Sequence, residues 1–133
     1  MTCRHLVAIF SWAAVVILAV PTGVAAERDP DGSRMMARKH KVGSEERDRL
    51  SPPSDVVDWR YFRIKESRAL TIVVGYESKG SSATISLTDA TGESLGQATG
   101  VDGRAELTVE LERGVYFFGV SASSGLSYSV KIQ

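Results

Sequence analysis

Apolar and polar residues alternate along the second half of the chain, and this alternation is the main structural signal in the sequence. Every second residue is apolar over 104–112, and the same pattern returns over 126–133. Such alternation is typical of β-strands that bury one face and expose the other. Two stretches, 69–74 and 115–120, are apolar on both faces, as central strands tend to be. The predicted strands are 62–65, 69–74, 83–88, 93–98, 104–112, 115–120 and 126–133.

Turns rich in Gly, Asp and Ser separate these stretches. No segment has a helical period, and residues 55–133 contain no proline that would interrupt a strand ladder. Short strands with a turn about every ten residues are typical of sandwiches and barrels. We therefore predict one all-β domain over 55–133, a small antiparallel β-sandwich of about seven strands.

The first 26 residues have the pattern of a signal peptide. Arg4 and His5 precede an apolar run over 6–20, and small residues follow it up to Ala26. This run is shorter than the roughly 20 residues of a transmembrane helix, and small residues before a cut suit signal peptidase. We predict cleavage after Ala26 and export to the periplasm or the cell exterior, with no stable membrane span after cleavage. Retention of the segment as an anchor is the alternative.

Residues 27–54 are rich in charged residues, Pro, Gly and Ser, and they contain no aromatic residue. Their few aliphatic residues have no regular spacing, so little apolar surface is available to offset the entropy of ordering. We predict a disordered charged spacer over 27–54. It contains His40, the one histidine beyond the signal peptide, and such a spacer would not hold a histidine in a fixed position.

Charge and cysteine content narrow the classes of function. The chain has 16 basic and 16 acidic residues, so no overall field favours nucleic acid. Its single cysteine, Cys3, would leave with the signal peptide. The mature protein would then have no disulfide, no thiolate metal site and no cysteine nucleophile.

Four stretches resemble a known family. They are 58–64 (DWRYFRI), 87–92 (LTDATG), 111–120 (LERGVYFFGV) and 128–130 (YSV). In this order they resemble the bacterial pre-peptidase C-terminal domain, a jelly-roll-like β-sandwich attached to many secreted proteases. The resemblance implies an accessory, non-catalytic module that adheres to a substrate or surface or assists secretion, sometimes with calcium. No protease domain accompanies the module in this sequence, so no host enzyme indicates its substrate.

The spacing of Leu111, Gly114 and Tyr116 is that of a tyrosine corner, in which a tyrosine hydroxyl bonds to backbone near the preceding turn. We expect Gly114 to supply a backbone conformation that other residues resist. Tyr116 is therefore predicted to be structural.

The residues of 55–133 do not favour catalysis. No histidine is present to activate a serine, and the carboxylates of Glu106, Glu110 and Glu112 lie on the exposed side of one predicted strand. Solvated carboxylates have nothing to raise the pKa of one of them and make it an acid. We predict that the protein is not an enzyme.

Two kinds of binding site stay open. Calcium takes oxygen ligands from loops and turns, and four aspartates fall at such positions: Asp55, Asp58, Asp89 and Asp102. Aspartate is also a common turn residue, so we expect no cofactor and keep calcium as the open alternative. If Phe62 faces the core, then Trp59, Tyr61 and Arg63 point away from it and could form a ligand surface.

The sequence thus predicts an exported, non-catalytic β-sandwich that binds a polysaccharide or protein of the cell envelope or exterior. The alternative is a structural or inhibitory partner of another exported protein, joined to it by pairing of strand edges.

Overall fold

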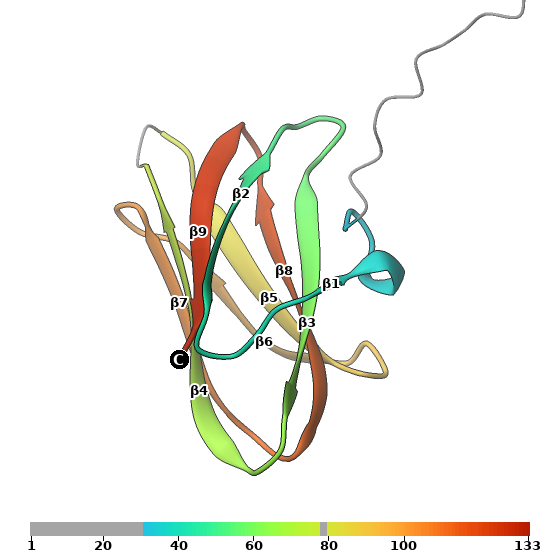
Figure 1. Ribbon diagram of the computed structural model, residues 1–133. Coiled ribbons are helices and arrows are strands. Elements are labelled where there is room, and N and C mark those ends of the chain that lie inside the picture. Colours follow the sequence, from blue (N-terminus) through green and yellow to red (C-terminus); the bar gives the residue numbers. More distant parts are fainter. Residues whose placement is uncertain (1–30, 78–79) are drawn as a thin grey trace, which may run out of the picture.

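Each stretch of alternating residues forms a strand at the predicted place. The computed structural model describes residues 31–77 and 80–133, which form two β-sheets packed face to face (Figure 1). Within the described residues, one 3₁₀ turn, η1, precedes the strands. The elements are η1 (Arg34–Met36), β1 (Arg38–Lys39), β2 (Glu45–Leu50), β3 (Val57–Ile64), β4 (Arg68–Tyr76), β5 (Ala83–Asp89), β6 (Ser94–Thr99), β7 (Arg104–Leu111), β8 (Gly114–Ala122) and β9 (Leu126–Ile132).

The strands form one sheet of five and one of four. Sheet A has the order β1-β3-β8-β5-β6, and sheet B has the order β2-β9-β4-β7. All neighbours are antiparallel except the short β1, which runs parallel to β3. The predicted antiparallel β-sandwich is confirmed, with nine strands among the described residues in place of about seven.

The core lies between the sheets and is built from every second residue of the strands. In β7 the inward residues Ala105, Leu107 and Leu111 are buried, and the outward Glu106 and Glu110 are exposed, as the alternation predicts. A slip of one residue in any pairing would turn a buried row outward, so burial itself fixes the register. The buried apolar residues are Leu50, Phe62, Ile64, Leu70, Ile72, Val74, Ala83, Ile85, Leu87, Ala105, Leu107, Leu111, Phe118, Val120, Leu126, Tyr128, Val130 and Ile132.

The prediction of a disordered spacer over 27–54 is wrong for residues 31–54. Strand β2 pairs with β9 along its whole length, and Leu50 at its end is fully buried. His40, expected to be unconstrained, is buried between the sheets. The domain therefore extends well before residue 55. Alternation does not reveal β2 in the sequence, because two of its inward positions carry the acidic residues Glu46 and Asp48 where apolar residues would be expected. Arginine side chains balance the charges of both.

The predicted tyrosine corner is present. The hydroxyl of Tyr116 donates a hydrogen bond of 2.7 Å to the backbone carbonyl of Glu112, across the turn between β7 and β8. The expectation for Gly114 is wrong, because its φ angle does not lie in the left-handed region. The predicted signal peptide, 1–26, falls outside the described residues. Within 31–77 and 80–133, no helix has the length and apolar character needed to cross a membrane.

Candidate functional site: two sheet faces and a buried polar cluster

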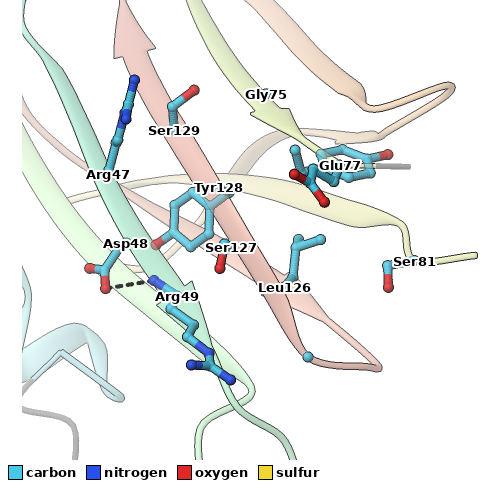
Figure 2. A pocket seen from close by; sticks show the side chains of 12 residues that line it. Arg47, Asp48, Arg49, Gly75, Glu77, Ser81, Leu126, Ser127, Tyr128 and Ser129 are labelled. Carbon is cyan, nitrogen blue, oxygen red and sulfur yellow. Dashed lines mark hydrogen bonds between the residues drawn. The ribbon is translucent and has the colours of Figure 1, made fainter. Parts of the chain in front are cut away.

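An open cleft of about 820 Å³ lies at one end of sheet B, where β2, β9 and β4 run side by side (Figure 2). Arg47 and Arg49 of β2 line it beside Ser127 and Ser129 of β9. These four side chains belong to the outward rows of their strands, since the intervening Tyr128 is buried. The sequence analysis did not identify this cleft. The lining residues are Arg47, Asp48, Arg49, Gly75, Tyr76, Glu77, Ser81, Gly125, Leu126, Ser127, Tyr128 and Ser129.

The opposite outer surface, that of sheet A, carries the aromatic residues that the sequence predicted to point away from the core. Along β3, Phe62 is buried, whereas Trp59 and Tyr61 are half-buried and Arg63 is exposed. The rings of Tyr61 and Phe117, on the neighbouring β8, lie 6.0 Å apart between centroids. We call the surface formed by Trp59, Tyr61, Arg63 and Phe117 the aromatic face.

Two features shape the aromatic face. A Cβ atom at Gly119 of β8 would lie 3.3 Å from the indole of Trp59, so glycine lets this ring settle closely on the sheet. At the other side, the guanidinium of Arg34 lies 5.4 Å from the centroid of the Phe117 ring, a cation–π contact. This contact places η1 against sheet A, with Met35 98% and Met36 58% exposed to solvent. The face thus combines packed rings with exposed apolar side chains.

A cluster of charged residues lies between the two sheets, with a buried centre and half-buried or exposed members around it. Its centre is Arg60, an inward residue of β3 that is 1% exposed. Its guanidinium donates to Glu46, and a second bond of 2.7 Å reaches Asp48. Arg38 donates to Asp31 over 2.6 Å and also contacts Asp48. Arg60 therefore joins the segment that precedes residue 55 to β3, whereas Arg38 links two parts of that segment to each other.

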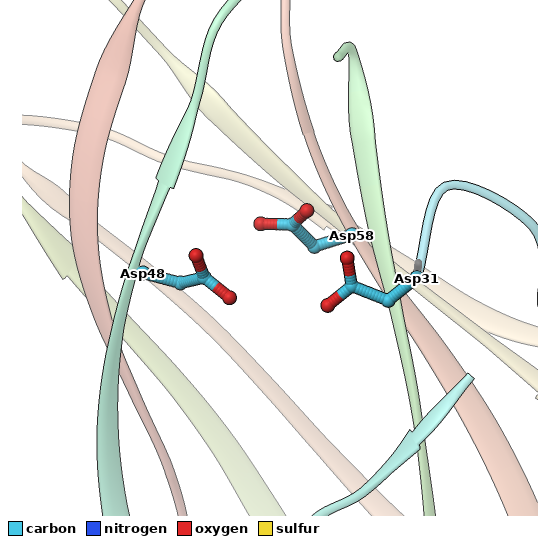
Figure 3. Close-up of side chains that lie close together, drawn as sticks. All are labelled: Asp31, Asp48 and Asp58. Carbon is cyan, nitrogen blue, oxygen red and sulfur yellow. The ribbon is translucent and has the colours of Figure 1, made fainter. Parts of the chain in front are cut away.

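Three carboxylates of this cluster, those of Asp31, Asp48 and Asp58, lie close together (Figure 3). One oxygen from each lies within 4.8 Å of the others. Asp58 is fully buried and accepts a hydrogen bond from the Tyr128 hydroxyl. Burial raises the pKa of Asp58 to about 8, and the negative charges of nearby aspartates act in the same direction, against the hydrogen bond from Tyr128. Asp58 is therefore mostly protonated at neutral pH.

The remaining members of the cluster are held in fixed positions. His40 Nε2 lies 3.0 Å from the carbonyl of Ser44, and His40 Nδ1 lies 3.6 Å from Glu46. Burial lowers the pKa of His40. Burial also raises the pKa of Tyr128, and its bond to Asp58 adds to this effect. The ring of His40 packs edge-on against Phe118, 5.9 Å between centroids.

The four aspartates predicted as calcium ligands are not gathered into one group. Asp58 belongs to the cluster. Asp55, just before β3, lies close enough for its negative charge to help raise the pKa of Asp58. Asp89 lies across from Tyr116, near the end of sheet A away from Asp55. Its Oδ1 accepts the backbone N–H of Thr91 at 2.8 Å, a turn-forming role. Asp102 occupies a turn with φ of 51°.

Sequence reasoning missed Asp31 and Asp48, which lie in the region assigned to a spacer. Together with Asp58 they provide the oxygen atoms that a divalent cation prefers. Arg38 and Arg60 already contact two of the three carboxylates, however, so a cation would have to compete with these arginines. A signal for the cluster was present in β3, where Asp58 and Arg60 fall on the same side as Phe62.

Comparison with known proteins supports the fold. No family model matches the chain, and no curated protein sequence matches it. The structure is similar to the pre-peptidase C-terminal domain of collagenase from Bacillus anthracis, with a TM-score of 0.65 and 15% sequence identity. The match covers 73% of this chain and 94% of that domain. A β-glucosidase from Paenibacillus barengoltzii is matched over 71% of this chain and 11% of its own, at 18% identity and a TM-score of 0.39, too low to support an argument.

Proposed function

We propose that the protein is an exported, non-catalytic module that binds a polysaccharide or protein of the cell envelope or exterior through the aromatic face. The chain has the fold of the pre-peptidase C-terminal domain, and this fold confirms the resemblance seen in the sequence. The predicted signal peptide supports an exported location, in the periplasm or outside the cell. Both lines favour an accessory module that operates beyond the cytoplasmic membrane.

The aromatic face is the observation that carries this proposal. Trp59, Tyr61 and Phe117 lie on the outer side of sheet A, where the core makes no use of them. Tryptophan, tyrosine and arginine are the residues that contribute most to binding energy at interfaces. Flat rings on a rigid sheet lose little entropy on binding, so they suit stacking on sugar rings or on a peptide.

The described residues also support a non-catalytic role. His40 is fixed, but its ring nitrogens are directed at the Ser44 carbonyl and the Glu46 carboxylate, and no serine hydroxyl is among the hydrogen-bond partners of this ring within the described chain. Glu106 and Glu110 are exposed on β7, as expected for a solvated surface. The buried carboxylates bond to arginines and to Tyr128, which holds them in structural roles.

A co-sedimentation assay with insoluble polymers tests the proposal. Purified peptidoglycan, chitin and collagen serve as probes, and the double variant Trp59→Ala/Tyr61→Ala is compared with the unaltered protein. We expect the variant to lose binding to the retaining polymer by roughly tenfold or more, because aromatic anchors at interfaces contribute about 2 kcal/mol or more each. Its melting temperature should stay close to that of the unaltered protein, since neither ring lies in the core.

A matched control comes from the same sheet. Thr84 and Thr99 lie across from each other on β5 and β6, with their hydroxyl oxygens 3.3 Å apart. The double variant Thr84→Ala/Thr99→Ala alters the outer surface of sheet A away from the aromatic face and should bind as before. Equal loss in both double variants, or unaltered binding in Trp59→Ala/Tyr61→Ala, would contradict the proposed surface. Recovery of one exported protein partner, insensitive to Trp59, would favour the alternative of strand-edge pairing.

A further inference from the structure

The cleft on sheet B has a regular arrangement of side chains that its strand register explains. Arg47 lies directly across from Ser129, and Arg49 directly across from Ser127. On the far side of β9, Ser129 in turn lies across from Gly75 of β4. The cleft therefore has two arginines along one wall, the small residues Ser127, Ser129 and Gly75 along its floor, and Glu77 on the far side (Figure 2).

The arginine wall faces one acidic residue across the cleft, Glu77, but its guanidinium groups are not paired with it. Farther along the same two strands, Lys131 lies across from the opposite charge of Glu45. Arg47 and Arg49 lie across from serines instead, both are exposed, and neither forms an ion pair within the described part of the chain. Asp48 lies between them in sequence, but its carboxylate points inward to Arg60. The two guanidinium groups are thus available to an anionic ligand.

Gly75 keeps the floor of the cleft low. A Cβ atom at this position would lie 3.2 Å from the hydroxyl oxygen of Ser129, closer than most contacts of this kind. With glycine there, the Ser129 hydroxyl stays open to the cleft next to Arg47. A guanidinium and a hydroxyl side by side match a carboxylate and a neighbouring hydroxyl of one sugar.

We propose that this cleft binds an acidic polysaccharide whose sugars carry carboxylates. Arg47 and Arg49 are two residues apart on one strand, so their side chains leave the backbone about 7 Å apart. Two such groups in a row suit a polymer with a charge on successive sugars. Each planar guanidinium binds a carboxylate through two parallel hydrogen bonds, and the serines bind sugar hydroxyls.

This site is separate from the aromatic face. The cleft lies on sheet B, whereas Trp59 and Tyr61 lie on the outer side of sheet A, so the core separates the two surfaces. The inference goes beyond the proposed function, because it adds a second ligand on the opposite side of the sandwich. A module with both surfaces could join an acidic polymer to the ligand of the aromatic face.

Titration calorimetry with polygalacturonate at low salt tests the inference. The purified protein should bind polygalacturonate and should not bind its highly methyl-esterified form, which has the same ring without the charge. The variant Arg47→Ser/Arg49→Ser should bind roughly tenfold or more weakly, because two charge-assisted contacts are lost. The variant Arg47→Lys/Arg49→Lys keeps the charge but not the planar guanidinium. Its affinity for polygalacturonate should lie between that of the unaltered protein and that of Arg47→Ser/Arg49→Ser.

The matched control removes the same charge at the other end of the sandwich. Lys65 and Arg113 are exposed in the turns after β3 and β7, so Lys65→Ser/Arg113→Ser should keep the affinity within about twofold. An equal loss of affinity in the two serine variants would show that binding depends only on net charge, and it would overturn the inference. Failure of the unaltered protein to bind polygalacturonate would overturn it as well. So would aggregation of Arg47→Ser/Arg49→Ser at unchanged affinity, which would show that these arginines protect the exposed edge of β2.

The outcome can be separated from that of the proposed function. Trp59→Ala/Tyr61→Ala should bind polygalacturonate with unchanged affinity, because its substitutions lie on the other sheet. A loss of polygalacturonate binding in that variant would overturn the assignment of this ligand to the cleft.

Discussion

Replacing Asp58 with asparagine should change how the stability of the domain depends on pH. The carboxyl of Asp58 has a pKa of about 8 in the fold, against 3.8 as the ordinary value. Between these values the folded state holds one more proton than the unfolded state, so stability decreases as the pH rises and levels off above the folded pKa. The stabilising contribution is complete below pH 3.8 and is lost as the pH passes through about 8.

The size of the effect follows from the same values. One pKa unit corresponds to about 1.4 kcal/mol, so the free energy of unfolding should decrease by roughly 1.6 kcal/mol between pH 6.5 and 8. We choose this window because the opposing contribution of His40, whose pKa is lowered by burial, is at most about 0.4 kcal/mol above its unfolded value of 6.5. In Asp58→Asn this decrease should vanish, because the amide oxygen can still accept the bond from Tyr128 but cannot ionise.

Urea unfolding followed by tryptophan fluorescence at several pH values from 6.5 to 8 measures the effect. Asp102→Asn is the matched control, because Asp102 is exposed in a turn whose φ angle asparagine tolerates. The control should keep the slope of the unaltered protein. A wild-type stability that stays level or rises over this window, or an equal slope in Asp58→Asn, would refute the reasoning that burial keeps Asp58 protonated.

Three further results are expected. Leu107→Ala should lower the free energy of unfolding by about 2–5 kcal/mol in urea, whereas Glu106→Ala should have almost no effect, because only Leu107 faces the core; equal effects would contradict the assignment of faces. Arg60→Met should cost about 3 kcal/mol and speed amide hydrogen exchange over 45–50, because half-buried Glu46 loses its arginine and half-buried Asp48 keeps only Arg38; unchanged exchange there would show that β2 is held by other contacts. Millimolar calcium, compared with a chelator, should shift the melting temperature by no more than about 1 °C, because the arginines of the cluster already balance its carboxylates; a larger rise would establish a calcium site.

The strands of the second half of the chain were predictable because alternation directly reports which face is buried. In β7 and β9 the inward residues are apolar, so the pattern, the strand and the register all agree. The corner at Tyr116 was predictable for a similar reason, since its bond is local. The outward direction of Trp59 followed from the position of Phe62 three residues later.

Strand β2 was not predictable from alternation alone, because its inward side is stabilised by charge. Glu46 and Asp48 face the interior because Arg60 reaches both from β3, a strand of the other sheet, and Arg38 also contacts Asp48. A polar segment then looks disordered when it is taken by itself. The available signal was Arg60 itself. It lies two residues before Phe62 and therefore on the same, buried side of the strand. A buried cation requires acidic partners, which must come from elsewhere in the chain.

The course of the chain before residue 55 has a practical consequence for anyone who cuts this protein into pieces. Between residues 38 and 50 the backbone passes from the rim of sheet A to the rim of sheet B, where β2 occupies the free side of β9 (Figure 1). A fragment that begins at Pro52 or Pro53 would lack β2, so the hydrogen-bonding edge of β9 would be exposed. The guanidinium of Arg60 would also stay in the apolar interior without its acidic partners. Such a fragment should associate with itself through that bared edge. An expressed fragment of this protein should therefore begin before Asp31, and a fusion partner should be joined before that residue.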